Sequence, residues 1–449
     1  MRNSVLAALG FILCVAEARA QSPDNVQRLV DRLDVLEKSN RSMIEELRSL
    51  RAEVAALRAP SVPDAAPDAA AEQLAVDERR IEEQAQTKVE SAQRFPLRLS
   101  GMLLINAYAN GKQGYGQDNP TIAARRPSTS SSGSTLTQSF FGLEFNGPRT
   151  FGGGKVHGSV YFDFYDRSDE TWTTNLNLRT ARVDVDWRTR SVMAGQDKPL
   201  ISPREPTSLA RVAISPLSDS GNLWFWQPQA RVEQRVSAGE SAGFRLQGAV
   251  IETNESASAY AGGLLGSLNF EPARPGVEGR LEFWKAGSDT RRVEIATGVH
   301  ASTSHVGGFS APTRVYSADW LLRPERRIEV TGTVFTGRNV AAIGSGLYGF
   351  GVRPDGNVFA VRSHGGWAQL KVQATERVSF NAFGGLQGGN RADLGPGAIT
   401  SNRSYAGNVM FRLAPNVMLA FEALRLRTAY LQTGTRQNGH YDLALAYLF

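Results

Sequence analysis

The chain has 449 residues, of which 41% are hydrophobic and 44 are glycine, with 50 basic against 44 acidic side chains. This composition excludes a disordered or collagen-like chain, and a glycine content above the usual ~7% indicates many turns and strands. The basic excess lies in residues 95 to 449, where 37 Lys and Arg are set against 28 Asp and Glu.

Residues 1 to 20 have the features of a secretory signal peptide. Arg2 precedes an apolar run over residues 5 to 16, and Ala18-Arg19-Ala20 supplies the small residues that precede a cleavage site. The apolar run is too short for the ~20 residues of a membrane-spanning helix. The mature chain is therefore expected to begin at Gln21. Since the single cysteine, Cys14, lies in the removed segment, we expect neither disulfides nor thiolate metal sites.

A coiled coil is predicted for residues 21 to 59. Between residues 26 and 57, nine of the ten a and d positions of one heptad frame are apolar, which is the pattern of a helix that associates with other helices. The polar exception, Asn40, is of the kind that fixes register and oligomeric state. An amphipathic helix packed on its own domain is the alternative, which the narrow apolar stripe disfavours. The positions expected to hold the oligomer together are Leu33, Leu36, Asn40, Met43, Leu47 and Leu50.

Residues 60 to 94 are predicted to be a linker. Pro60, Pro63 and Pro67 stand in an Ala- and Asp-rich run that ends the helix. Residues 72 to 93 carry few apolar positions, which predicts at most a weak polar helix.

From residue 95 to 449 the chain alternates apolar and polar residues, so that successive side chains take opposite faces of a strand. Val156, Val160 and Phe162, for example, alternate with His157 and Ser159. Segments of about nine to twelve residues exceed the usual strand length and suit a tilted strand that crosses a bilayer. The sequence predicts an all-β transmembrane barrel of about 16 antiparallel strands. They are expected to begin near residues 97, 135, 155, 176, 191, 228, 244, 275, 291, 313, 328, 364, 378, 402, 417 and 438.

The connections between these segments alternate in length. Short turns are predicted near residues 189, 289, 325, 376 and 415, and long loops over 110 to 134, 165 to 175, 197 to 227, 254 to 274, 302 to 312, 336 to 363, 388 to 400 and 428 to 437. All long loops then lie at one rim, as in bacterial outer-membrane barrels with short periplasmic turns. Both termini, and with them the coiled coil, are expected in the periplasm.

The last strand is predicted to place Tyr441, Leu443, Leu445, Tyr447 and the terminal Phe449 on its lipid face. A terminal Phe on such a strand resembles the signal that bacterial outer-membrane barrels present to the barrel assembly machinery. On the opposite face, Asp442 is expected to point into water.

The third long loop, residues 197 to 227, contains four prolines and the basic residues Lys198, Arg204 and Arg211. Together with Gly195-Gln196 before it and Trp226-Gln227-Pro228-Gln229-Ala230-Arg231 at its end, it resembles the DcaP-like trimeric porins, which also carry an amino-terminal coiled coil. The resemblance implies a homotrimer in the outer membrane that takes up small anionic solutes such as dicarboxylates. In general porins the third external loop folds inward and narrows the channel.

The residues expected to line the pore constriction are Lys198, Arg204, Arg211, Arg231, Arg235 and Arg280. The last three share the polar faces of their strands, and Arg245 does so on a neighbour. Guanidinium groups bind carboxylate or phosphate in a bidentate manner, so a ring of them in a narrow pore favours anions. The alternative is a structural network, in which these arginines pair with Asp and Glu of the lumen without strong selectivity.

Other classes of function are less well supported. His157 and Ser159 resemble the His-x-Ser pair of outer-membrane phospholipases and lipid A deacylases, but those pairs face lipid whereas this one is expected to face inward, so no enzyme is predicted. No metal, cofactor or nucleic-acid partner is expected. A structural anchor, tying the barrel through its coiled coil to the cell wall or a periplasmic partner, stays open beside transport.

Overall fold

The computed structural model describes residues 97–165, 175–253, 274–287, 290–306, 308–353 and 357–449, together with Ser49. The chain divides into two compact units, Met1–Arg94 and Phe95–Phe449. Apart from Ser49, the predicted signal peptide, coiled coil and linker lie outside the described residues. Among the helices of the described part, none has the length and apolar character needed to cross a membrane.

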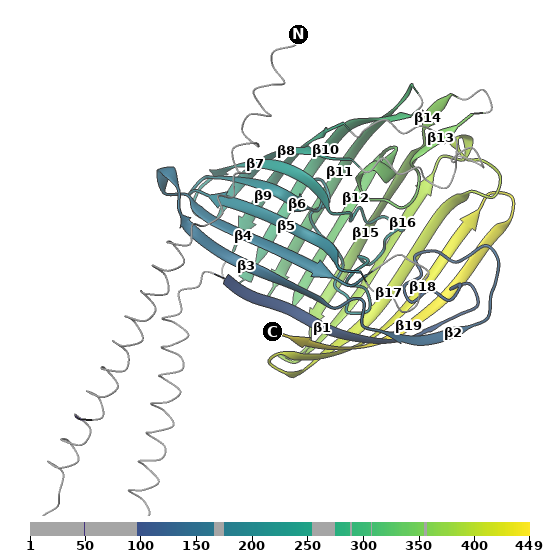
Figure 1. Ribbon diagram of the computed structural model, residues 1–449, viewed down its shortest axis with the longest axis horizontal. Coiled ribbons are helices and arrows are strands. Elements are labelled where there is room, and N and C mark those ends of the chain that lie inside the picture. Colours follow the sequence, from purple (N-terminus) through teal and green to yellow (C-terminus); the bar gives the residue numbers. More distant parts are fainter. Residues whose placement is uncertain are drawn as a thin grey trace, which may run out of the picture. The chain divides into compact units, whose positions relative to one another are not determined.

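Seventeen strands of the described residues form one antiparallel sheet (Figure 1). They are β1 (Leu97–Asn110), β2 (Ser131–Thr135), β3 (Phe140–Arg149), β4 (Lys155–Asp163), β5 (Asn177–Asp186), β6 (Arg190–Asp197), β7 (Gln227–Ser237), β8 (Ala242–Ile251), β9 (Gly276–Ala286), β10 (Arg292–Val306), β11 (Phe309–Glu325), β12 (Ile328–Arg338), β15 (Arg362–Gln373), β16 (Val378–Gly389), β17 (Ile399–Ala414), β18 (Val417–Tyr430) and β19 (Gly434–Leu448). A separate hairpin pairs β13 (Phe350–Val352) with β14 (Val358–Ala360), and the described residues include three 3-10 helices, η2 (Phe151–Gly153), η5 (Val340–Ile343) and η6 (Arg391–Asp393).

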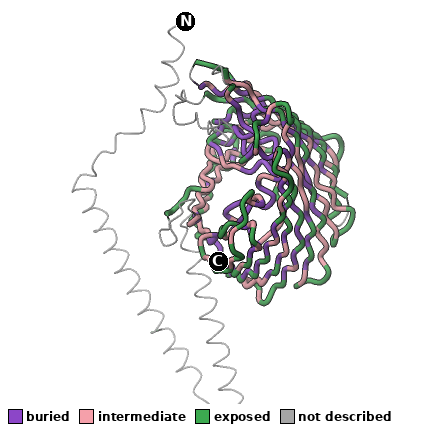
Figure 2. The backbone as a smooth tube through the Cα atoms, turned by 90° about the vertical axis from the view of Figure 1, so that its right-hand side faces the viewer, coloured by how far each residue is buried: buried purple, intermediate pink, exposed green. Residues whose placement is uncertain are grey.

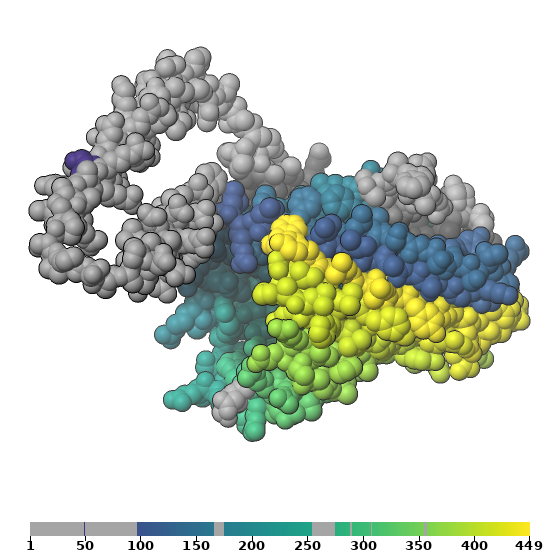
Figure 3. All heavy atoms as spheres, turned by 90° about the horizontal axis from the view of Figure 1, so that it is seen from below, coloured from purple at the N-terminus to yellow at the C-terminus, as the bar shows by residue number. Residues whose placement is uncertain are grey.

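The sheet closes on itself as a barrel. β1 pairs with β19 along one edge, so the blue amino-terminal strands lie beside the yellow carboxy-terminal strands in Figure 3. Along its other edge β1 pairs with β3 through its first half and with β2 through its second half. Because β2 and β3 together fill one position in the wall, the described strands make a barrel of sixteen positions. The predicted barrel is confirmed, and each of the sixteen expected segments overlaps a strand.

The break between β2 and β3 was not predicted, and side chains compensate for it. The Ser139 hydroxyl accepts a hydrogen bond from the Leu104 backbone N–H at 2.9 Å and donates to the Leu104 carbonyl at 3.1 Å. These bonds replace part of the backbone pairing that β1 loses at the break. Gln138, in the same break, is buried and points into the barrel.

The two rims differ as expected, with two corrections. Short turns at residues 187–189, 374–377 and 415–416 lie at one end of the strands, here called the short-turn rim, and the longer connections lie at the other end, the long-loop rim. The predicted long loops over 302 to 312 and 428 to 437 are wrong in length, because both are short hairpin turns. At the first, β10 continues to Val306 and β11 starts at Phe309. At the second, β18 continues to Tyr430 and β19 starts at Gly434. Polar residues there were read as loop, although a polar stretch can remain strand where its backbone pairs with a neighbour.

The two faces of the wall are those predicted by the alternation. On β19, Tyr441, Leu443 and Tyr447 are about half exposed on the outer surface (53, 48 and 47%), whereas Asp442 is 3% exposed. Figure 2 shows this alternation of buried and exposed residues along the strands. Asp442 faces inward as predicted, but it does not meet water. Leu209 packs on Leu104, Met410 and the neighbouring alanines of β18 and β19, which means that a loop covers this part of the inner wall.

Candidate functional site

The connection between β6 and β7, residues 198–226, lies inside the barrel and is called the inner loop here. Much of it is buried, including Leu200, Ile201, Ala210 and Leu223. The burial comes from the inner faces of strands far away in the sequence, since Ile201 and Leu223 share a cluster with Val315 and Phe335 of β11 and β12. The predicted inward fold of the third long loop is therefore observed.

Polar side chains of the wall hold the backbone of the inner loop at spaced points. Ser317 of β11 donates to the carbonyl of Ile201 at 3.0 Å, Asn408 of β17 donates to that of Thr207 at 2.9 Å, and Asn106 of β1 donates to that of Leu209 at 2.9 Å. Gln138 adds a bond from its Nε2 to the carbonyl of Ala210 at 2.9 Å. The loop is thus fixed against wall strands from β11 to β1, and backbone groups that would otherwise be buried unpaired are satisfied.

One glycine is required where the loop lies flat on the wall. Gly221 has a φ of +101°, which favours glycine. A Cβ atom on Gly221 would also collide with the backbone of Gly366 and Leu386. The close approach of the inner loop to β15 and β16 therefore depends on the absence of a side chain at this position.

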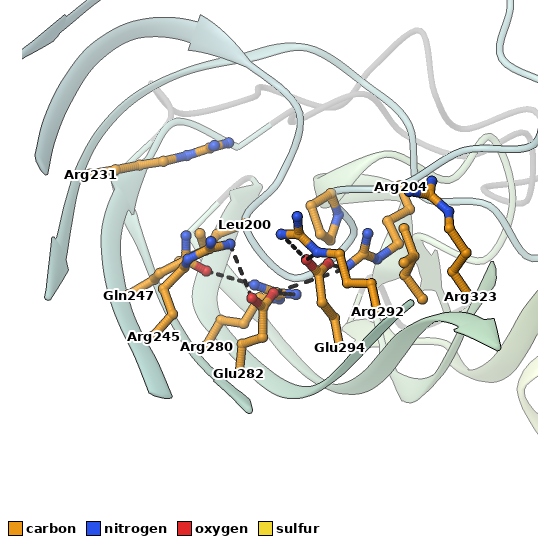
Figure 4. Close-up of a pocket in the computed structure, with 12 residues that line it drawn as sticks. Leu200, Arg204, Arg231, Arg245, Gln247, Arg280, Glu282, Arg292, Glu294 and Arg323 are labelled. Carbon is orange, nitrogen blue, oxygen red and sulfur yellow. Dashed lines mark hydrogen bonds and ion pairs between the residues drawn. The ribbon is translucent and has the colours of Figure 1, made fainter. Parts of the chain in front are cut away.

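Between the inner loop and the wall is a cavity of about 330 Å³, called the arginine cavity here (Figure 4). Its lining comes from the inner loop and from strands β7 to β11. Six arginines and two glutamates contribute to it. The lining residues are Leu200, Pro203, Arg204, Arg231, Arg245, Gln247, Arg280, Glu282, Arg292, Glu294, Leu321 and Arg323.

Three buried carboxylates organise the floor of the arginine cavity. Glu282 pairs with Arg280 at 2.6 Å and with Arg245 at 3.0 Å. Asp319 accepts from Nη2 of Arg280 at 2.8 Å and from Nε of Arg204 at 3.2 Å. The third carboxylate, that of Glu294, pairs with both Arg204 and Arg292. Every carboxylate thus has at least two arginine partners, and pairing is the condition under which a buried charge is tolerated.

The carboxylates and the arginines differ in their access to the lumen. The side chains of Glu282 and Asp319 are each 1% exposed and that of Glu294 is 5% exposed, whereas Arg245 and Arg292 are 28 and 49% exposed. In Figure 4 the labelled Arg245 and Arg292 extend from the wall toward the open space, and Arg231 projects from the opposite side. A solute that enters this space meets guanidinium groups first.

Three of the six predicted constriction residues, Arg204, Arg231 and Arg280, line the arginine cavity. Lys198 lies beside it: its ammonium pairs with Glu205 at 2.6 Å, and its carbonyl accepts a hydrogen bond from Arg231. Burial alone would raise the pKa of Glu205, but the charge of Lys198 and its hydrogen bond outweigh burial and lower this pKa below its ordinary value. Lys198 is therefore paired with a carboxylate of its own loop.

The other two predicted residues lie elsewhere. Arg211 is buried at 3% exposure and donates to the carbonyl of Pro120, and burial lowers the pKa of its guanidinium. Arg235 lies at the short-turn rim, where it pairs with Asp186 at 3.3 Å and donates to the carbonyl of Trp187 at 3.1 Å. Neither is among the residues that line the arginine cavity.

Two lining residues, Arg292 and Arg323, were missed from the sequence. They face each other directly across β10 and β11. The signal was present, because Arg292 lies two residues from Glu294 and Arg323 four from Asp319, and even spacing on a strand means a shared face.

The His-x-Ser pair singled out in the sequence forms no catalytic contact in the structure. His157 hydrogen-bonds through Nδ1 to the Asn146 side chain at 3.1 Å. A second His-x-Ser pair was overlooked: His300 bonds through Nε2 to Ser302 at 2.8 Å and through Nδ1 to Glu278 at 3.0 Å. Its members are buried, and Glu278 also accepts the backbone N–H of Leu200 at 2.6 Å. This chain of hydrogen bonds ties the inner loop to the wall.

Solved structures of other proteins share the fold of this chain. The chain matches no protein-family model and no curated protein sequence. Among solved structures it resembles the outer membrane channel DcaP of Acinetobacter baumannii, with a TM-score of 0.63 and 14% identity over 79% of this chain and 97% of that chain. It also resembles an anion-selective porin from Comamonas acidovorans, with a TM-score of 0.54 and 11% identity over 79% of this chain and 99% of that chain. The resemblance to DcaP-like porins read from the sequence is confirmed at the level of the fold.

Proposed function

We propose that this protein is an outer-membrane porin for passive diffusion of small hydrophilic solutes, with preference for anions of the dicarboxylate class. The observation that carries the proposal is the arginine cavity, in which guanidinium groups face the lumen and their carboxylate partners are buried behind them. The printed names of the two similar structures, a channel and an anion-selective porin, agree with it.

The chemistry of the cavity suits a carboxylate solute. A guanidinium group offers two parallel N–H donors to one carboxylate, and Arg245 and Arg292 each retain exposed surface after pairing with the wall. Guanidinium groups on facing sides of the cavity allow one solute to be bound at both ends. A volume of about 330 Å³ is at the lower end of the range for small-molecule sites, which fits a small solute.

The structural-network alternative uses the same ion pairs but predicts a different result. If the arginines only support the inner loop, their charge is cancelled by Glu282, Glu294 and Asp319, and the channel has little selectivity. If they serve solutes, the uncovered guanidinium groups raise the local concentration of anions. A measurement of anion selectivity therefore distinguishes the structural role of the arginines from a role in solute passage.

The test is the reversal potential of the full chain in planar bilayers across a potassium chloride gradient. We expect anion preference in the wild type and its reduction in the double variant Arg245→Ala and Arg292→Ala. This pair is chosen because Glu282 keeps Arg280 and Glu294 keeps Arg204, so that no buried carboxylate is left alone. Arg188→Ala, which removes an exposed charge from the turn between β5 and β6, is the matched control. Cation preference in the wild type, or an equal effect of the control, contradicts the proposal.

We further propose a homotrimer whose coiled-coil helices, residues 21 to 59, associate in the periplasm. The apolar outer wall of the barrel supports association, for instance the aromatic cluster of Phe141, Phe162 and Phe164. Native mass spectrometry of the detergent-solubilised protein should give trimers, and monomers alone would refute this. The alternative function, a structural anchor to the cell wall or a periplasmic partner, predicts no single-channel conductance.

A further inference from the structure

Three arginines lie side by side on the outer face of the barrel, close to the long-loop rim. Arg314 of β11 stands directly opposite Arg338 of β12, which stands directly opposite Arg362 of β15. All three are exposed, whereas the adjacent Val315 and Ser363 are buried on the inner face. These three residues are called the arginine row here.

The row is not neutralised within the described part of the chain. Arg362 forms a two-bond pair with Asp393 at 2.8 and 2.9 Å. Arg314 donates only to backbone carbonyls, including that of Ser302 at 2.9 Å. The side chain of Arg338 makes no hydrogen bond or ion pair with the residues that the structure describes. Like charges directly opposite each other destabilise a sheet, so this arrangement calls for an anion from outside the chain.

The arginine row borders a hollow of about 530 Å³ on the outer wall. Tyr316, Thr336 and His364 line the hollow from the same face, and they supply further hydrogen-bonding groups. No acidic side chain lines it among the described residues. A second group has the same character, because Arg403 of β17 stands directly opposite Arg427 of β18.

The level of the row on the wall points to a lipid headgroup. Tyr316 lies two residues from Arg314 toward the short-turn rim on the same face, and Trp320 lies four residues further on, so aromatic residues of the interfacial kind begin directly beside the row. Val334 and Leu370 continue the outer face in the same direction and are 46 and 43% exposed. A ligand with a charged head in the hollow can therefore lay apolar chains on the wall.

The long-loop ends of β1 and β7 lack this feature. At the long-loop ends of β1 and β7 the outward positions are Ala107, Ala109 and Pro228, which carry no charge. The arginine row is therefore a local feature of one side of the wall.

We propose that the arginine row binds the phosphate groups of a phosphorylated lipid of the outer leaflet, with its acyl chains against the apolar wall below. The inference relies on the orientation in the proposed function, in which the long-loop rim faces outward. Phosphate accepts hydrogen bonds from two guanidinium groups at once, and Arg338, with its donors free among the described residues, is the main contact. A lipid is preferred to free phosphate because the hollow is continuous with the lipid-facing surface.

The experiment measures binding of bisphosphorylated lipid A to the full-length protein in detergent, by native mass spectrometry, with dephosphorylated lipid A and inorganic phosphate as the other probes. We expect Arg338→Gln to weaken binding of the bisphosphorylated lipid about tenfold, the size of one charge-assisted contact. Arg190→Gln, an exposed arginine at the short-turn rim, is the matched control and should bind as the wild type does.

Three results would overturn the inference. These are equal binding of the dephosphorylated lipid, equal binding by Arg338→Gln, or saturation of the site by millimolar inorganic phosphate with no gain from acyl chains. Single-channel conductance is recorded for the same samples. If Arg338→Gln loses lipid binding while its conductance is unchanged, the result supports lipid binding by the arginine row. If the wild type binds the lipid but shows no conductance, the result refutes only the proposed porin function.

Discussion

The substitution Arg280→Met tests whether the floor of the arginine cavity holds the barrel together. Arg280 has a 3% exposed side chain and donates to Asp319, to Glu282 and, at 2.7 Å, to Gln247. Removing one member of a buried ion pair costs about 3 to 5 kcal/mol, because the partner remains as an uncompensated buried charge. Here Asp319 keeps Arg204 and Glu282 keeps Arg245. We therefore expect the lower end, a loss of about 3 kcal/mol.

The matched control is Arg245→Met, which removes a guanidinium from the same carboxylate. Arg245 is 28% exposed and Glu282 keeps Arg280 at 2.6 Å, so the expected loss is below ~1 kcal/mol. The assay is urea-induced unfolding in phospholipid vesicles, followed by tryptophan fluorescence. Replacing Asp319 by Asn in the Arg280→Met background should recover ~1 kcal/mol or more, since the buried charge that Arg204 alone would have to balance is removed. Equal losses for the two single variants, or no recovery, would refute the reasoning.

Two further predictions concern the wall. Leu443→Arg places a cation on the lipid face and should destabilise the barrel by ~2 to 4 kcal/mol near the bilayer midplane. The control, His157→Arg, faces Asp184 across β4 and β5 and should be tolerated. Urea unfolding measures the stability of both variants, and equal losses of stability would mean that the faces are misassigned. Deleting Phe449, whose backbone pairs with Gly101 at 3.0 and 3.1 Å, should reduce the amount of barrel in isolated outer membranes while leaving signal-peptide cleavage intact, and normal insertion would remove its proposed role in assembly.

The wall of the barrel was predictable because its signal is local. A period of two assigns each residue to a face without any knowledge of its neighbours in space. This is why Asp442 and Tyr447 were placed on the correct faces, and why all sixteen segments were found. The lengths of the hairpins at Val306 and Tyr430 were not predictable in this way, because the pairing that extends a strand beyond the apolar band depends on the neighbouring strand.

The inner surface was predictable only in part. The inward fold of residues 198–226 was expected, but not the side of the wall on which the loop lies. Arg204 pairs with Glu294 and Asp319, which are 90 and 115 residues away. Such contacts depend on the path of the loop across the lumen, which alternation does not encode. For the same reason Asp442 was expected in water but lies beneath Leu209.

The arginines of the arginine cavity and those of the arginine row thus stand in two chemical settings that composition alone does not separate. Four arginines of the arginine cavity share three buried carboxylates, so much of their charge is balanced within the protein, and their proposed effect on solutes depends on which guanidinium groups are uncovered. Arg338 in the arginine row has no such counter-charge among the described residues and faces outward. A basic excess in a membrane barrel is therefore no measure of anion selectivity until each arginine is assigned to a face. Here the face separates the role proposed in solute passage from the role proposed in lipid contact.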